Sequence, residues 1–273
     1  MKRGKPVPVV PRWPQPLGDA VEGLYAAFAH YPLKPHLDNC PHCSDERDDQ
    51  VLHSAPLREL KSDQLRDYAF SAMATMGDAS DYRHFLPRIL ELSLSQNSLP
   101  GLEPWLITGK LNYKEFGTLP PREMGALAEF NRALWSVLLA MSPVDSAGFV
   151  LPNAPINPWA PAWSAEDVLR LAADVTHCLP QLLQVWKPQE NKAHLWHFAE
   201  IVLHNHDSLG PTDIPFDEIQ NTQAREALRQ WILDEGKAAA LERAASDDVD
   251  SPWAEPSDRA AKVLRSYLDA QGA

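Results

Sequence analysis

Residues 57–94, LRELKSDQLRDYAFSAMATMGDASDYRHFLPRILELSL, decide the fold. Their apolar spacing, their capping residues and the glycine between the two segments all predict a pair of helices here. In the first helix, apolar side chains recur at spacings of three and four residues and share one face. Ser62 is placed to cap its start and Gly77 to end it, since glycine adopts the left-handed conformation of a C-cap without steric cost. The shared face consists of Leu65, Tyr68, Ala69, Ala72, Met73 and Met76.

The second helix of the pair begins at Asp78, with Asp81 three residues later as a carboxylate version of the capping box. Pro87 interrupts its apolar face, at a cost of about 3 kcal/mol in a helix interior, so we expect a kink or a new helical start near Phe85. A proline frees carbonyls that need donors, and this favours a structural role for His84 and Arg88 over catalysis. The apolar face consists of Tyr82, Phe85, Leu86, Ile89 and Leu90.

Composition extends the helical prediction to the whole chain of 273 residues. Glycine is scarce at 12 residues, proline is plentiful at 25, and Ala and Leu far outnumber Val, Ile and Thr. Such a balance is typical of helices separated by proline joints and disfavours a sheet protein. The sequence therefore predicts an all-α, irregular fold of about ten helices.

Helical periodicity and proline punctuation divide the chain into segments. We expect a flexible basic arm at 1–17, an N-terminal helical half at 18–142, a Pro- and Trp-rich connector at 143–163 and a C-terminal helical half at 164–273; alternatively, the two halves form one domain. In the connector, Trp159 and Trp163 are expected to dock onto helices, because burying indoles is worth several kcal/mol. The helices outside the central pair are expected at 18–30, 44–53, 121–141, 164–178, 180–187, 190–206, 215–244 and 256–270, with 105–116 undecided between helix and strand.

An internal echo suggests that the two halves are related repeats. Residues 82–92, YRHFLPRILEL, resemble residues 175–185, VTHCLPQLLQV, and each has a histidine three residues before a proline. Tandem duplication would give two helical-repeat halves, whereas chance matching in leucine-rich helices is the alternative.

The formal net charge of −12 limits the choice of partners. A phosphate backbone would be repelled by this field, so nucleic-acid binding is disfavoured. A basic protein partner fits the charge, and the acidic stretch 246–258 around Trp253 is either a docking motif or a plain linker. The sequence has no apolar run long enough to span a bilayer and too few cysteines, three, for a disulfide framework, so we expect a cytoplasmic protein.

The first candidate metal site is Cys40-Pro41-His42-Cys43 with His36 and His53 nearby. Two thiolates at this spacing can bind one zinc ion, and one or two histidines could complete a tetrahedron. A redox pair is an alternative, and so are unliganded reduced thiols in a loop.

The second candidate lies on the predicted helix AHLWHFAEIVLHNH, which holds four of the ten histidines. His197, Glu200 and His204 fall on one face, with His194 beside them, and could bind a transition metal or supply acid–base groups. Because metal sites in bundles normally draw ligands from facing helices, a solvated polar face is the favoured interpretation.

The chain contains no G-x-S-x-G, P-loop, G-x-G-x-x-G or H-E-x-x-H signature, which disfavours an enzyme. Our leading hypothesis is a protein–protein interaction module of immunity or adaptor type, with an acidic face or groove. One alternative is a metal-dependent enzyme or zinc-stabilised protein that uses the cysteine pair or the histidine helix. The other is a small-molecule sensor with a pocket between helices.

Residues 57–92, together with the CPHC segment before them and GKLNYKEF after them, resemble a group of uncharacterised bacterial proteins. The resemblance covers about residues 36–140 and, less clearly, the C-terminal half. It implies a bacterial, soluble and mostly helical protein. The group carries no known activity, so the resemblance assigns no site residues.

Overall fold

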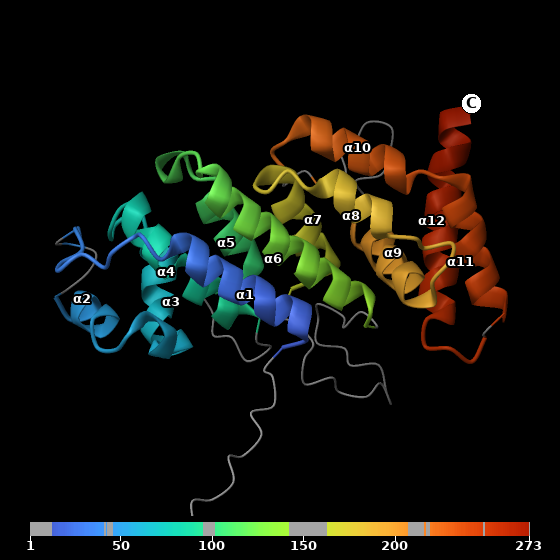
Figure 1. Cartoon of the computed structure of the whole chain (residues 1–273). Helices are drawn as coiled ribbons and strands as arrows, with labels where there is room; N and C mark the ends of the chain where they lie inside the picture. Colours follow the sequence, from blue (N-terminus) through green and yellow to red (C-terminus); the bar gives the residue numbers. More distant parts are fainter. Residues whose placement is uncertain are drawn as a thin grey trace, which may run out of the picture.

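The computed structural model describes residues 13–40, 42, 46–94, 102–141, 163–206, 216, 219–247 and 249–272. Within these ranges the chain forms twelve α-helices, two short 3-10 helices and no strand, which confirms the all-α prediction (Figure 1). In chain order the elements are α1 (Gln15–Phe28), α2 (Glu46–Leu52), η1 (Leu57–Glu59), α3 (Ser62–Ser71), α4 (Ala79–Ser93), α5 (Pro104–Leu111), η2 (Lys114–Phe116), α6 (Pro121–Leu139), α7 (Ala165–Asp174), α8 (Leu179–Val185), α9 (Lys192–His204), α10 (Thr222–Ile232), α11 (Glu235–Asp247) and α12 (Ala254–Gly272).

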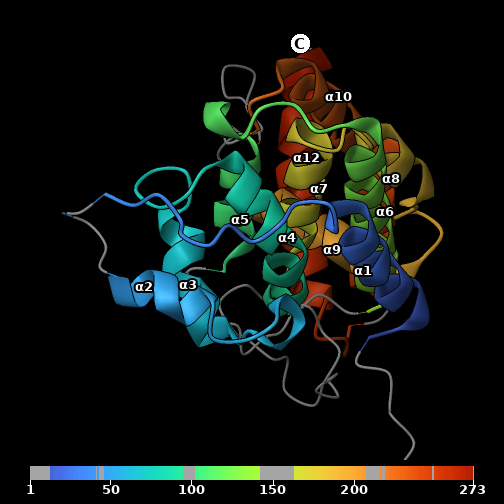
Figure 2. The same cartoon turned by 60° about the vertical axis from the view of Figure 1, so that its left-hand side comes forward.

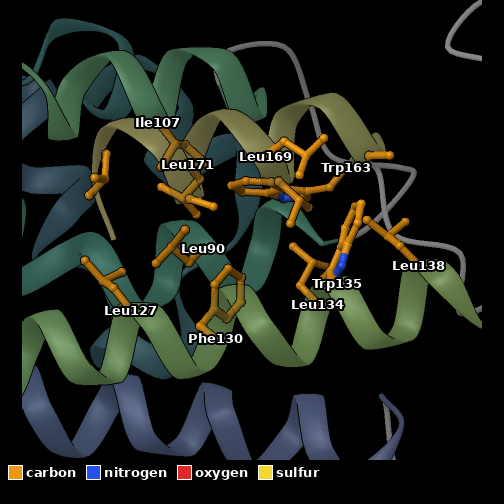
Figure 3. Packing of buried hydrophobic residues seen from close by; sticks show 14 of the residues in the cluster. Leu90, Ile107, Leu127, Phe130, Leu134, Trp135, Leu138, Trp163, Leu169 and Leu171 are labelled. Carbon is orange, nitrogen blue, oxygen red and sulfur yellow. The ribbon is translucent and has the colours of Figure 1, made fainter. Parts of the chain in front are cut away.

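Helix α6 lies at the centre of the fold. The sequence predicts its length to within two residues. Its apolar side chains cover more of the helix surface than one buried face would need, which indicates a helix covered on more than one side. Figure 3 shows α1 along one side of α6, while side chains from the other side pack among residues of α4, α5 and α7. The labelled residues of this packing are Leu90, Ile107, Leu127, Phe130, Leu134, Trp135, Leu138, Trp163, Leu169 and Leu171.

A single cluster of buried apolar side chains extends from Trp13 to Leu264 and joins helices from both predicted halves. Trp163 belongs to it, and its indole nitrogen donates to Ser93 Oγ at 3.0 Å. The docking expected for Trp163 is therefore confirmed. Trp159 and the rest of the predicted connector, like most of the predicted arm at 1–17, lie outside the described residues.

The second helix of the central pair begins as predicted. Asp78 caps α4 by accepting from the backbone N–H groups of Ser80 and Asp81, and the Asp81 carboxylate accepts from the Asp78 N–H at 2.9 Å. The three backbone N–H groups of Asp78, Ser80 and Asp81 are thus satisfied within one capping box.

The first helix of the pair is shorter than predicted. Lys61 occupies the N-cap position instead of Ser62, and α3 ends at Ser71, not at Gly77. The chain leaves the helix at Ala72 because residues 72–77 pair elsewhere: the Thr75 carbonyl accepts from the Cys40 N–H at 2.8 Å, and the Gly77 N–H donates to the Asp38 carbonyl at 2.6 Å. Tertiary hydrogen bonds therefore outweigh the helical pattern of this segment.

Pro87 neither ends α4 nor starts a new helix, since α4 runs unbroken through it. The two side chains beside the proline contact other segments: Arg88 Nε donates to the Leu60 carbonyl at 2.7 Å, and His84 Nδ1 lies 2.8 Å from the Tyr31 carbonyl. Their contacts are structural, but the carbonyls that they bind belong to neighbouring segments rather than to α4.

The structure settles one segment that the sequence leaves open between helix and strand, and it divides one predicted helix into two. Residues 105–116 are helical, in α5 and η2, and the helix expected at 215–244 is two helices. The break falls at Leu233–Asp234, where the Asp234 carboxylate accepts from the Lys237 N–H at 2.9 Å and so caps α11.

The two similar segments, 82–92 and 175–185, differ in secondary structure, and the structure does not confirm the repeat. Residues 82–92 lie within one helix, whereas residues 175–185 comprise a turn with His177 at φ 52° and helix α8.

Tryptophans organise the packing of the C-terminal helices. Trp186 stacks on Trp231 of α10 with ring centroids 4.5 Å apart, and it meets Trp135 of α6 edge to face at 5.0 Å. Trp253, in the acidic stretch 246–258, is buried and stacks on Trp196 of α9. Its indole therefore serves internal packing and is not exposed for docking. Among the described residues, no helix combines the length and the apolar character that a bilayer span requires.

We expect replacement of Gly77 by alanine to destabilise the fold. Gly77 has φ 64°, and an added Cβ would lie 3.1 Å from Cβ and Oδ2 of Asp81, so the cost should be about 1–3 kcal/mol. Gly109→Ala is the matched control, because a Cβ there meets nothing within 4 Å. Alanine at this position inside α5 should raise the free energy of unfolding by about 0.5–1 kcal/mol. Urea unfolding of both variants measures the difference, and equal shifts would contradict the argument.

Candidate functional site

A groove lies between the outward faces of α1 and α6. It has a volume of about 460 Å³. The lining positions recur at helical spacing on both helices, and several are alanine or glycine, which lets a ligand chain approach the backbone closely. The lining residues are Pro16, Asp19, Ala20, Gly23, Ala126, Glu129, Arg132, Ala133 and Ser136.

The charges of the groove are carried by three side chains. Glu129 and Arg132 form an ion pair one helical turn apart on α6. Asp19 on α1 is exposed and has no ion-pair partner among the described residues. The groove therefore combines small apolar walls with one unneutralised carboxylate.

A buried polar joint fixes α1 against α6 at one end of the pair. The Glu123 side chain is only 2% exposed; it accepts from Tyr31 Oη at 3.0 Å and lies 3.3 Å from Nε2 of His30. Arg122 donates to the Ala26 carbonyl at 2.7 Å. Because the buried carboxylate requires these partners, the two helices hold one relative position, and the groove is preformed.

The structure places part of the predicted cysteine site. Cys40 is half-buried, whereas Cys43 lies outside the described residues. His36 and His53 both face Asp49, with their Nδ1 atoms 3.3 and 3.4 Å from its carboxylate oxygens. In the described part of the chain, no three His, Cys, Asp or Glu side chains are grouped to hold a metal ion, so the zinc prediction depends on Cys43.

His53 is engaged at both ring nitrogens. Nδ1 lies 2.8 Å from the Asp49 carbonyl and Nε2 lies 2.8 Å from the Lys34 carbonyl. Two carbonyl acceptors require two N–H donors, so this geometry selects the imidazolium, and both carbonyls raise the pKa of His53. In this arrangement His53 offers no lone pair to zinc; it fastens α2 to the segment around Lys34.

The histidine helix, α9, does not present its residues as a solvated face. His197 is buried, and its Nε2 lies 2.8 Å from the Leu138 carbonyl and 2.9 Å from the Met141 carbonyl at the end of α6. Its Nδ1 is 3.8 Å from Glu200, while His204 is exposed. The favoured interpretation is therefore wrong for His197, which satisfies the terminal carbonyls of α6.

His194 also serves the local fold. Its Nδ1 accepts from the Lys187 N–H at 3.0 Å, and burial together with nearby His197 lowers the pKa of His194. A neutral imidazole suits that acceptor role.

Sequence reasoning did not locate the α1–α6 groove. The available signal was the recurrence of small residues, Ala20 and Gly23 on one helix and Ala126 and Ala133 on the other. Periodicity identifies the buried side of each helix, but it does not say which two outward faces will lie beside each other.

We expect the stabilisation provided by His53 to decrease as pH rises. Its folded-state pKa is raised, so the contribution is fully present below the unfolded value of about 6.5 and is lost as pH rises through the folded value. Partial exposure limits the effect to less than about 1 kcal/mol. Urea unfolding of the wild type and His53→Gln between pH 5 and 9 measures it, with NMR titration of the His53 ring as the direct check. A pKa at or below 6.5 would contradict the two-donor geometry.

Comparisons with protein-family models, with curated proteins and with solved structures find no match to this chain.

Proposed function

We propose that this protein is a helical interaction module that receives a basic segment of a partner protein in the α1–α6 groove. The observation that carries the proposal is a preformed groove with small walls and the unpaired Asp19 carboxylate at its edge. An extended or helical segment can approach such walls closely, and a lysine or arginine from it can pair with Asp19. An adaptor or an immunity-type inhibitor of a basic protein fits this chemistry.

The overall charge supports the same class of partner. The whole chain carries −12, and residues 1–12 contain four basic residues and no acidic ones, so residues 13–273 carry −16. A field of this sign accelerates the approach of a positively charged partner and repels nucleic acids.

Partner binding should depend on Asp19. A partner captured by affinity purification is titrated against the wild type and Asp19→Lys at two salt concentrations. Charge reversal at the groove should weaken binding about tenfold, equivalent to about 1.4 kcal/mol, and salt should weaken wild-type binding more than variant binding.

The matched control is Asp269→Lys, which makes the same change in net charge at an exposed position on α12, far from α1 in Figure 1. Circular dichroism establishes that both variants fold. Equal binding by the two variants would reject the groove as the binding surface. Binding that ignores both salt and charge reversal would reject the electrostatic mechanism as well.

A further inference from the structure

A second cavity lies among α7, α8 and α10, and it shares no residue with the α1–α6 groove. Its volume is about 340 Å³, within the range of small-molecule sites. Ala172 of α7, Leu179 and Leu183 of α8 and Ala224 of α10 supply apolar walls, and His177 and Gln223 add polar groups. The 60° turn between Figures 1 and 2 shows these helices from two sides.

One wall is held from inside the core by a buried amide. Asn131 of α6 is completely buried, and its Nδ2 lies 3.3 Å from the Val168 carbonyl and 3.2 Å from Oγ1 of Thr176. The Thr176 N–H donates to the Leu171 carbonyl at 3.0 Å. These contacts hold Thr176, the residue directly before His177, in place, and so they fix the turn between α7 and α8.

The fixed turn places His177 in a strained conformation. Its φ is 52°, in the left-handed region that side chains other than glycine rarely adopt. His177 lines the cavity and is exposed, and no hydrogen-bond partner for its ring occurs among the described residues. Internal hydrogen bonding of the ring therefore does not explain a histidine here. Strain of this kind concentrates at binding sites.

The opposite wall is equally fixed and favours a neutral ligand. The Asp174 carboxylate accepts from the N–H groups of Gln220 and Asn221 at 3.1 and 2.9 Å, and Asn221 donates to the Ala173 carbonyl at 3.2 Å. Asp174 thus already provides negative charge at the α10 N-terminus, where an anion would otherwise be favoured. Each oxygen of this carboxylate already accepts one backbone N–H, and Asp174 is not among the residues that line the cavity.

We propose that this cavity binds a neutral, largely apolar small molecule whose hydrogen-bonding group meets the imidazole of His177. Apolar walls supply burial, and the imidazole, which can donate or accept, sets the orientation. The site is independent of the proposed partner groove, so either can fail without the other.

The test titrates the full-length protein with cyclohexylmethanol as the neutral probe and cyclohexanecarboxylate as its charged counterpart, observed by NMR. The alcohol should bind in the millimolar range and at least tenfold more tightly than the carboxylate. His177→Gly removes the imidazole while suiting the φ of the turn, so it should fold normally and bind the alcohol about fivefold more weakly, the loss of one hydrogen bond.

Ala227→Phe provides a second variant, because Ala227 lines the cavity yet is exposed, and the ring should obstruct the cavity without disturbing the core. Gln230→Phe is its control, since it adds the same ring on α10 at an exposed position outside the lining. Loss of binding in the first variant but not in the second supports the site. The proposal is overturned if the wild type does not bind the alcohol, if alcohol and carboxylate bind equally, if His177→Gly binds like the wild type, or if the two phenylalanine variants behave alike.

Discussion

The burial of α6 on opposite sides is the constraint on which the rest of the structure depends. One side carries α1, and side chains on the other pack among those of α4, α5 and α7, so α6 is enclosed from both sides. A helix covered in this way must also satisfy polar groups away from water. Near its start Glu123 accepts from Tyr31, and in its middle Asn131 donates to Thr176. At its end the Leu138 carbonyl accepts from His197 of α9.

The same constraint explains how both sites form. Glu123 holds the residues that directly follow α1 against α6, beside the groove between the outward faces of the two helices. Asn131 reaches through the core to the turn that carries His177, and this turn forms one wall of the second cavity. Polar residues that a sequence pattern would count against a buried helix are therefore the ones that shape the molecule's concave surfaces.

Much of the fold follows from local sequence, and the exceptions have identifiable causes. The start of α4 and the extent of α6 are determined by neighbours within a turn, which makes them predictable from Asp78, Asp81 and the apolar spacing. The early end of α3 is not, because Thr75 and Gly77 bond to residues 38–40, far away in sequence. His197 was misjudged for the same reason, since its partners lie 56 and 59 residues away. The groove and the cavity both require knowing which helices become neighbours, and periodicity does not supply that information.

The stacking of Trp231 on Trp186 has a consequence for observing the molecule. Trp231 belongs to α10, which forms one wall of the His177 cavity, while Trp186 follows directly on α8, which contributes to the other. Any displacement of α10 relative to α8 changes the overlap of two indole chromophores that now lie 4.5 Å apart. A displacement of that kind would therefore alter the intrinsic tryptophan signal of the protein, without an attached dye.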